Sequence, residues 1–365
     1  MTTDFAHDFR RSELARGLGL QIRRESRTPA RLMEFCGGHT VAIFKYGIRQ
    51  LLPPTVTMLS GPGCPVCVTA NADLDKAIAL ARVPGIILTT FGDMLKVPGS
   101  HSSLQEARAD GADVRLVYST MDALEIARKN PERPVAFLGI GFETTAPTVA
   151  ASVLQADQEG LKNYYILSQH KTCPPIIRAL LDSGEVKLQG LVCPGHVSAV
   201  IGSRPWEFIA AEYGIPCVVS GFEPTDILQC IAMLVAQIER KEARVEIAYR
   251  RGVRPEGNQR ALEVMAGVFE PCEASWRGMG MVPGTGLKLR PKYERFDAES
   301  AFELDPGPTR EHAGCICGEI LRGVKTPRDC KLFAKVCDPE HPVGPCMVSH
   351  EGSCSAYYIY GAAHG

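Results

Sequence analysis

One pattern repeats through the middle of the chain and constrains its fold more than any other feature. A short run of β-branched and apolar residues leads into a motif rich in Gly or Pro, and a helical stretch follows. This alternation is typical of α/β proteins, because continuous apolar strands belong to parallel sheets that helices cover on both faces. The pattern predicts strands at residues 56–59, 86–89, 135–138, 165–167, 191–192 and 218–219.

Polar motifs come directly after these strands. Gly141-Phe-Glu143 and Gly221-Phe-Glu223 are alike, and the strands fall into two groups that separate near residue 130. In open parallel sheets, ligands collect beyond the carboxyl ends of the strands. We therefore expect two similar α/β halves that face each other across a cleft, with the motifs along its edges.

Less regular segments flank the two halves. Leu14, Leu18 and Ile22 share one side of an expected N-terminal helix, and helical spacing returns from Thr225 onwards. Beyond about Arg251 the chain is rich in Gly, Pro and Arg and loses strand periodicity, which indicates an irregular third domain. The expected organisation is a helical segment at 1–30 that packs on the third domain, α/β domain I at 31–130, α/β domain II at 131–225 and an α-rich third domain at 226–365.

Composition narrows the possible functions. The 365 residues are 45% hydrophobic and 22% charged, which suits large cores, and a net charge of −1 leaves no overall basic field for nucleic acid. The N-terminal stretch lacks the apolar core of a signal peptide, and no later apolar run approaches the ~18 residues of a membrane span. We therefore expect a cytoplasmic protein. Its cysteines are then metal ligands, redox thiols or buried residues, because a reducing compartment disfavours structural disulfides.

Six of the 14 cysteines crowd into the last part of the chain among Gly, Pro and charged residues. Four thiolates can hold a zinc ion or an iron–sulfur cluster, and such a group stabilises a loop-rich segment that has little apolar core. The spacing matches neither the bacterial ferredoxin run nor paired zinc knuckles, so it indicates metal without naming it. Aromatic and apolar neighbours favour iron–sulfur. The six are Cys315, Cys317, Cys330, Cys337, Cys346 and Cys354.

Two tight motifs near the N-terminus hold three more cysteines, Cys36-Gly-Gly-His39 and Cys64-Pro-Val-Cys67. Cys64 and Cys67 lie between an expected strand and a helix, whose N-terminus lowers a thiol pKa, so a redox pair is one interpretation. The alternative is a zinc site of three Cys and one His to which both motifs contribute. The flanking glycines let backbone approach a bound group closely, which favours an open, single-thiolate iron site at Cys36.

Two further polar residues are candidates at the sheet edges. Glu143 suits a base or a hydrogen-bond acceptor, although acids near Thr and Pro are also common at helix starts, and Glu223 is the weaker of the two related glutamates. His196 follows a strand beside a glycine, where it is either structural or functional. The isolated cysteines are interpreted as packing residues: Cys173, Cys193, Cys217, Cys230 and Cys272.

Several longer motifs resemble, in the right order, those of one family, the HypD proteins of NiFe-hydrogenase maturation. The resemblance covers most of the chain. It implies two Rossmann-like α/β domains and a third domain that binds a 4Fe-4S cluster. The motifs are Met33-Glu-Phe-Cys-Gly-Gly-His-Thr40, Gly61-Pro-Gly-Cys-Pro-Val-Cys67, Phe91-Gly-Asp93, Gly141-Phe-Glu-Thr-Thr-Ala-Pro147, Pro194-Gly-His-Val197, Gly221-Phe-Glu-Pro224, Trp276-Arg-Gly278 and Met347-Val-Ser-His-Glu-Gly-Ser-Cys354.

The resemblance also implies a function and residue roles. It implies a scaffold that works with the small chaperone HypC, on which an iron atom acquires two cyanides and one carbon monoxide; HypE delivers the cyanide. The family expectation is a monomer that forms such heterocomplexes. By the family pattern Cys36 holds the nascent iron jointly with a HypC thiol, His39 lies beside it, and Cys64 and Cys67 form the redox pair. The implied cluster ligands are Cys317, Cys330, Cys337 and Cys354, with Cys315 and Cys346 as extra thiols.

These roles predict an electron path from the cluster through the Cys64/Cys67 pair to iron at Cys36, because the ligand chemistry at the iron is reductive. A rival interpretation is an iron–sulfur thiol-disulfide oxidoreductase that acts on a protein disulfide without HypC. A third is a binding protein stapled by zinc. The first hypothesis requires that the two N-terminal motifs meet and that Cys36 faces room for a small adduct.

Overall fold

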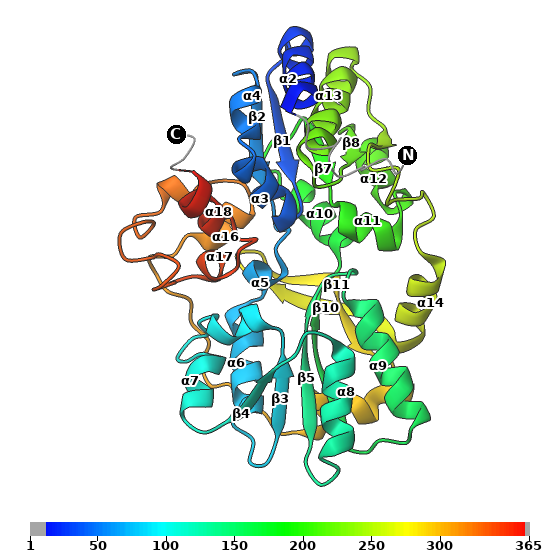
Figure 1. Ribbon diagram of the computed structural model, residues 1–365, viewed down its shortest axis with the longest axis vertical. Coiled ribbons are helices and arrows are strands. Elements are labelled where there is room, and N and C mark those ends of the chain that lie inside the picture. Colours follow the sequence, from blue (N-terminus) through cyan, green and yellow to red (C-terminus); the bar gives the residue numbers. More distant parts are fainter. Residues whose placement is uncertain (1–11, 362–365) are drawn as a thin grey trace.

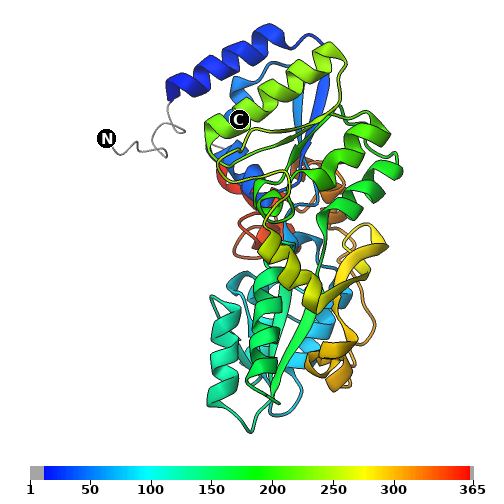
Figure 2. The same cartoon turned by 90° about the vertical axis from the view of Figure 1, so that its right-hand side faces the viewer.

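The computed structural model describes residues 12–361 of the chain. Two α/β units lie along the long axis, and we call them the upper and lower units after their positions in Figure 1. The C-terminal cysteine-rich segment, residues 310–361, lies beside their junction (Figure 1). Figure 2 shows the N-terminal helix across the top of the upper unit, away from that junction. No helix of residues 12–361 is long and apolar enough to cross a bilayer.

The upper unit is built on a five-stranded sheet in which all neighbours are parallel, in the order β2-β1-β7-β8-β9. Its register places Leu32 opposite both Met58 and Gly190. Strands β7 and β8 are buried along their whole length, as strands with helices on both faces should be. The strands are β1 (Ala30–Glu34), β2 (Val56–Ser60), β7 (Gly190–Cys193), β8 (Cys217–Val219) and β9 (Val245–Ile247).

The lower unit contains a second parallel sheet of four strands, in the order β4-β3-β5-β6. Its longest pairing runs from Val135 opposite Tyr164 to Gly141 opposite His170. Every residue of β5 is buried, which places this strand at the centre of the unit. The strands are β3 (Ile87–Thr90), β4 (Asp113–Leu116), β5 (Val135–Gly141) and β6 (Tyr164–His170).

Two parallel-sheet units are therefore confirmed, but the expected boundaries at residues 130 and 225 are wrong. Strands β3 and β4 precede residue 130 and pair in one sheet with β5, which follows it. The upper sheet combines residues 30–60 with residues 190–247. The physical reason is that every βα repeat has the same apolar pattern, so the pattern marks strands without specifying which of them pair.

Helices of the upper unit include the N-terminal one, which was expected to pack on residues 226–365. Helix α2 contacts α13, which lies almost wholly in that range, and also α4; α13 itself packs on β7 and β8. Buried Ile22, Ile227 and Leu228 belong to one core cluster there. Residues 1–11 of the expected segment lie outside the described residues. The helices are α2 (Ser12–Glu25), α3 (Gly37–Lys45), α4 (Ile48–Leu51), α11 (Gly195–Ile201), η2 (Arg204–Trp206), α12 (Glu207–Tyr213) and α13 (Pro224–Arg240).

Helices of the lower unit follow the βα rhythm predicted for it. Two of them begin with a capping box, in which Ser103 and Ser119 accept backbone N–H groups of the first helical turn. Helix α9 contacts β5, α8 and α14. The helices are α6 (Asn71–Ala81), η1 (Gly92–Lys96), α7 (Leu104–Ala109), α8 (Thr120–Lys129), α9 (Ala146–Gln158) and α14 (Gln259–Val268). Helix α10 (Cys173–Asp182) begins just after β6 but lies in the upper unit, where Arg178 pairs with Glu212 of α12 (Figure 1).

An antiparallel hairpin, β10 (Phe269–Trp276) and β11 (Gly280–Leu289), lies between the two units (Figure 1). Sequence periodicity did not indicate it, because its strands mix buried, half-buried and exposed positions and a register shift falls between Cys272 and Ala274. The short elements η3 (Pro291–Phe296) and α15 (Ala298–Ala301) follow and contact β6.

The expected single third domain at 226–365 is also wrong in extent. Helix α13 and strand β9 belong to the upper unit, and the hairpin joins both units. What remains is the cysteine-rich segment, which is irregular and built of short helices as expected. It packs on α3 and on α5 (Pro65–Val68) at the junction of the units. Its elements are α16 (Cys317–Leu321), η4 (Pro327–Asp329), α17 (Pro345–Val348) and α18 (Ser353–Tyr360).

Candidate functional site

A cavity of about 350 Å³ opens between the carboxyl ends of the two sheets. Cys36, just before α3, and His196, at the start of α11, reach it from the upper unit, and Phe142 and Thr144 reach it from the loop after β5 in the lower unit. Glu351 of the cysteine-rich segment completes the wall. The cavity is therefore an interdomain cleft at the strand ends, the position at which open α/β sheets bind ligands.

Cys36 is the thiol of this cavity. It is the N-cap residue of α3 and is only 8% exposed, and its backbone N–H donates a hydrogen bond of 2.9 Å to a carboxyl oxygen of Glu34. Burial, together with the negative charges of Glu351 and Glu34, raises the pKa of Cys36 to about 12, while the backbone N–H groups of Gly38 and His39 oppose the rise. A bound cation would reverse this balance, because metal binding releases the thiol proton.

Glu34 ends β1 beneath Cys36 and is 1% exposed. Besides the N–H of Cys36, its carboxyl group accepts the hydroxyl of Thr40, so it ties the strand end to the first turns of α3. Burial raises the pKa of Glu34 to about 7, against the hydrogen bonds from Thr40 and Cys36. Glu34 thus fixes the direction in which the Cys36 side chain leaves the backbone.

His39 is fully buried one helical turn after Cys36. Its Nε2 lies 2.9 Å from the carbonyl oxygen of Gly221, and burial lowers the pKa of His39 to about 4, so the ring is neutral and Nε2–H donates to that carbonyl. Nδ1 then carries a lone pair that has no hydrogen-bond partner among residues 12–361. A neutral imidazole with a free lone pair can accept a proton or a metal.

Phe222 is a site residue that sequence reasoning missed. Its ring stacks on His196 with centroids 3.9 Å apart and on His39 with centroids 4.6 Å apart, so the two histidines sandwich one phenylalanine. Gly38 and Gly195 allow this approach, because a Cβ atom on either would lie 3.0–3.1 Å from the ring. Its sequence signal was the motif Gly221-Phe-Glu223, in which Phe222 directly precedes the glutamate.

The expected candidates Glu143 and Glu223 lie outside the cavity wall. Glu143 is 3% exposed and accepts the backbone N–H of Cys173 at 2.8 Å, and burial raises its pKa to about 7. Glu223 is the N-cap of α13, where it forms a capping box with Asp226. His196, in contrast, is exposed to the cavity, and partial burial lowers its pKa.

The two N-terminal cysteine motifs meet. Gly37 N–H donates to the carbonyl of Gly63 at 3.3 Å, and a Cβ atom on Gly63 would lie 2.2 Å from the nitrogen of Cys36. Only glycine therefore lets the segment before Cys64 lie against the Cys36 backbone, as the hypothesis of adjacent motifs required.

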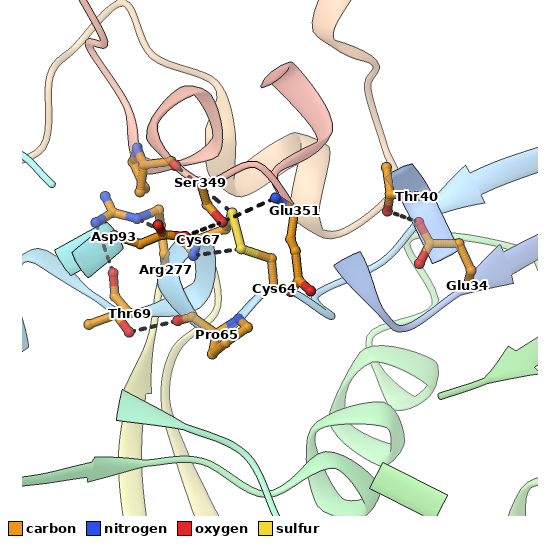
Figure 3. Close-up of a disulfide and its surroundings, with 11 residues drawn as sticks. Glu34, Thr40, Cys64, Pro65, Cys67, Thr69, Asp93, Arg277, Ser349 and Glu351 are labelled. Atoms are coloured by element: carbon orange, nitrogen blue, oxygen red, sulfur yellow. Dashed lines mark hydrogen bonds between the residues drawn. A yellow bond between two sulfur atoms is a disulfide. The ribbon is translucent and has the colours of Figure 1, made fainter. Parts of the chain in front are cut away.

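A disulfide joins Cys64 to Cys67 across α5, with Cα atoms 5.3 Å apart (Figure 3). The Sγ of Cys64 also accepts the backbone N–H of Cys67 at 3.3 Å, the N-cap geometry expected of a thiol at a helix start. Both residues are buried, at 4% and 0% exposure. Because these two sulfurs are bonded to each other, the alternative zinc site of three Cys and one His is not formed.

Glu351 is the second residue that sequence reasoning missed. Its side chain packs on Gly37, where a Cβ atom would lie 2.4 Å from the Cβ of Glu351, and it lies between the disulfide and the start of α3 (Figure 3). Burial raises the pKa of Glu351, and the charge of Asp93 raises it further. Its sequence signal was the C-terminal motif Met347-Val-Ser-His-Glu-Gly-Ser-Cys354, in which the cysteine drew attention.

The six C-terminal cysteines come together around one small enclosed cavity, with apolar Ile320, Leu332, Phe333 and Met347 between them. The expected set of Cys317, Cys330, Cys337 and Cys354 is therefore brought together, along with Cys315 and Cys346. Sulfur donors in apolar surroundings fit an iron–sulfur cluster. The enclosed space is about 10 Å³, so a four-iron cluster requires these side chains to move apart. No three His, Cys, Asp or Glu side chains of residues 12–361 are arranged for a single metal ion.

The disulfide pair and the cysteine-rich segment are in contact. The Sγ of Cys67 lies 4.0 Å from the carbonyl oxygen of Pro345, the residue before Cys346. Cys67, Cys317 and Cys346 belong to the same buried cluster. The disulfide therefore lies against the segment that carries the six cysteines.

These features define a class of protein with two parallel α/β units, a buried thiol in the cleft between them and a cysteine-rich segment behind that cleft. Residues 13–361 match the family model described as "HypD: Hydrogenase formation hypA family". The chain belongs to this HypD family of hydrogenase maturation factors.

Named relatives resemble almost the whole chain. The chain is 48% identical to hydrogenase maturation factor HypD2 of Bradyrhizobium diazoefficiens, over 98% of the chain and 97% of that protein. It is 48% identical to HypD of Rhizobium leguminosarum bv. viciae, over 98% of the chain and 95% of the relative. It is 46% identical to HypD of Escherichia coli K12, over 91% of the chain and 89% of the relative.

Proposed function

We propose that this protein, together with a HypC-type chaperone, is the scaffold on which an iron atom acquires two cyanide ligands and one carbon monoxide for a NiFe hydrogenase. The observation that carries this proposal is that Cys36, a buried thiol, faces a cavity of about 350 Å³ at the junction of two α/β units. Iron with small diatomic ligands needs a soft thiolate in a confined site that excludes water.

The residues around Cys36 have distinct tasks in this scheme. Iron is the substrate, and Cys36 holds it as a thiolate once the thiol proton has left. Glu34 aims the cysteine through its N–H, and the free Nδ1 of His39 accepts a proton or supports the iron. His196, stacked on Phe222 and exposed to the cavity, donates hydrogen bonds to the incoming ligands.

The Cys64–Cys67 disulfide acts as a two-electron store. Two electrons and two protons convert it to two thiols, and both leave again towards the iron and its ligand precursors when the disulfide re-forms. Cys317, Cys330, Cys337 and Cys354 would hold a 4Fe-4S cluster, which supplies single electrons from an external low-potential donor. Cys67 lies against the segment that carries these cysteines, so the transfer path is short.

The proposal includes two partner proteins. One thiolate and one histidine leave positions on the iron open, and the HypC-type chaperone contributes a second thiol at the mouth of the cavity. A HypE-type protein delivers cyanide to the same opening. We propose a monomer that assembles with each partner in turn in the cytoplasm.

Infrared spectroscopy of the complex with HypC tests this proposal. Cyanide and carbonyl bands are expected for the native chain. They should disappear in C36A and in C64A, while the visible absorption of the cluster persists. C272A is the matched control, since Cys272 lies on the hairpin outside this site, and it should keep the bands. Undiminished bands in C36A would overturn the scaffold role, and undiminished bands in C64A would overturn the electron store.

An iron–sulfur thiol-disulfide oxidoreductase is the second candidate, favoured by the disulfide beside the cysteine-rich segment. The burial of Cys64 and Cys67 argues against a protein disulfide as substrate, because its sulfur could not reach either residue without local opening. Steady reduction of a protein disulfide by the purified protein without HypC would favour this candidate.

A further inference from the structure

The tip of the β10–β11 hairpin lies between the disulfide and the cysteine-rich segment. Thr69, just after α5, forms an antiparallel bridge with Trp276, and Arg277 N–H donates to the carbonyl of Val68 at 2.9 Å. On the other side, Gly278 packs on Gly318, where a Cβ atom on Gly278 would lie 2.4 Å from the Cα. Gly318 directly follows Cys317. The hairpin tip therefore lies between Cys67 of the disulfide and Cys317 of the cysteine-rich segment.

Arg277 fills this position with a buried positive charge, at 4% exposure. Its Nε donates to the carbonyl of Cys67 at 3.2 Å, and its Nη2 donates to the carbonyl of Thr69 at 2.8 Å and to Oδ1 of Asn71 at 2.6 Å. Figure 3 shows the guanidinium beside the disulfide. Three neutral acceptors therefore hold this charge in one place next to Cys67.

The positive charge of Arg277 is only partly neutralised by a negative side chain. Its ion pair is with Glu311, at 3.1 Å, but the Glu311 side chain is 48% exposed and is screened by water. Burying a cation without a buried counter-charge is costly. Arg277 directly precedes Gly278, which packs on Gly318, the residue directly after Cys317. An iron–sulfur centre held by thiolates carries negative charge at that position, and the potential of such a centre depends on net charge nearby.

We propose that Arg277 is a positioning residue that couples the two redox sites. Its fixed guanidinium offsets the negative charge of the cluster at Cys317 and raises the cluster's reduction potential. Its hydrogen bond to the carbonyl of Cys67 keeps the thiol pair at a constant distance from the guanidinium. This inference rests on the proposed cluster and thiol pair. It assigns a task to Trp276-Arg-Gly278, a motif to which sequence reasoning gave no role.

Redox titration of the anaerobically purified full-length protein tests the proposal. Iron and sulfide content is measured first in the native chain, R277K and R277M, and the cluster potential is then followed by electron paramagnetic resonance. R277M should show a lower cluster potential than the native chain, and R277K should lie between them. R128M is the matched control, because the ion pair of Arg128 with Glu159 lies on the surface of the lower unit; its potential should equal that of the native chain.

A second variant keeps the test decisive if R277M does not fold. E311Q leaves Arg277 in place and removes the negative charge that partly neutralises it, so the cluster potential should rise. Unchanged potentials in a fully loaded R277M, or an unchanged or lowered potential in E311Q, would overturn the role of Arg277. Absence of iron and sulfide from the native chain would instead refute the proposed cluster, so the two failures are distinguishable.

Discussion

The backbone N–H of Cys36 donates a hydrogen bond of 2.9 Å to Glu34, so the last residue of β1 fixes the N-cap residue of α3. We expect E34Q to retain the fold, because an amide oxygen still accepts this bond, and to lower the pKa of Cys36, because a charge that raises it is lost. E34A should destabilise the protein by about 1–3 kcal/mol, since two buried donors lose their acceptor. Pulsed alkylation followed by mass spectrometry, with Cys272 as the internal reference, measures the first effect, and slower alkylation of Cys36 in E34Q would contradict it.

Glu143 should make stability depend on pH. Burial raises its pKa from 4.5 to about 7 in the folded chain, so the folded state holds a proton over a range in which the unfolded state has lost it. The contribution of Glu143 to stability therefore falls as pH rises from about 4.5 to about 7, by on the order of 3 kcal/mol. Urea unfolding across this range measures it. E143Q should remove its share of the decline and leave the part due to Glu34, whose pKa burial also raises to about 7, whereas E207Q, at an exposed position of α12, should leave the whole decline unchanged.

Gly63 should not tolerate a methyl group. In G63A the new Cβ would lie 2.2 Å from backbone atoms of Phe35 and Cys36, so the two motifs must separate, at a cost of about 2–3 kcal/mol. G267A is the matched control within helix α14, where a Cβ atom has no neighbour within 4 Å, and it should stabilise by about 0.5–1 kcal/mol. Denaturant unfolding compares them, and equal stability of G63A and the native chain would contradict the close approach.

Phe222 should hold His39 and His196 in register at the cleft. F222L keeps most of the apolar volume and removes the stacked plane, worth about 0.5–1.5 kcal/mol. Iron binding at Cys36 should weaken by roughly 2–10-fold, while the iron and sulfide of the cluster remain. F208L tests a ring elsewhere in the upper unit, on α12, and should bind iron like the native chain. Native iron affinity in F222L would show that the stacking has no role at the site.

The four implied cluster ligands should be separable from the two extra thiols. We expect serine at Cys317, Cys330, Cys337 or Cys354 to reduce iron and sulfide content strongly, because the hard hydroxyl is a poor ligand for iron in such a cluster. C315S and C346S should retain the cluster. Iron and sulfide analysis with visible absorption distinguishes the six variants. Loss of the cluster in C346S would show that Cys346 is a cluster ligand in place of one of the four.

Much of the fold could be predicted, because buried parallel strands are short, continuous and apolar. The pairing of those strands could not be predicted, since the chain leaves the upper sheet after β2, builds the whole lower sheet and returns at β7. The hairpin escaped detection because it lies at the junction with few continuously buried positions. Register and topology are long-range properties that local periodicity does not contain.

The candidate site could likewise be predicted only in part. His196 could be placed because it follows a predicted strand, and the glycines near Cys36 correctly indicated close backbone approach, although strand β1 before Cys36 was not predicted. Phe222 was missed because an aromatic ring between two histidines has no spacing signature. Glu351 was missed because it comes from a distant segment that meets the cleft only through tertiary packing.

The interrupted path of the upper sheet has a consequence for biosynthesis. As the nascent chain leaves the ribosome, β1 cannot pair with β7 until residues 190–193 have been synthesised. The sheet is complete only after residue 247. The lower unit needs nothing beyond residue 170 for its strands and can fold earlier. Cys36, the thiol proposed to hold iron, is therefore synthesised long before the other segments that line the cleft, the last of which carries Glu351.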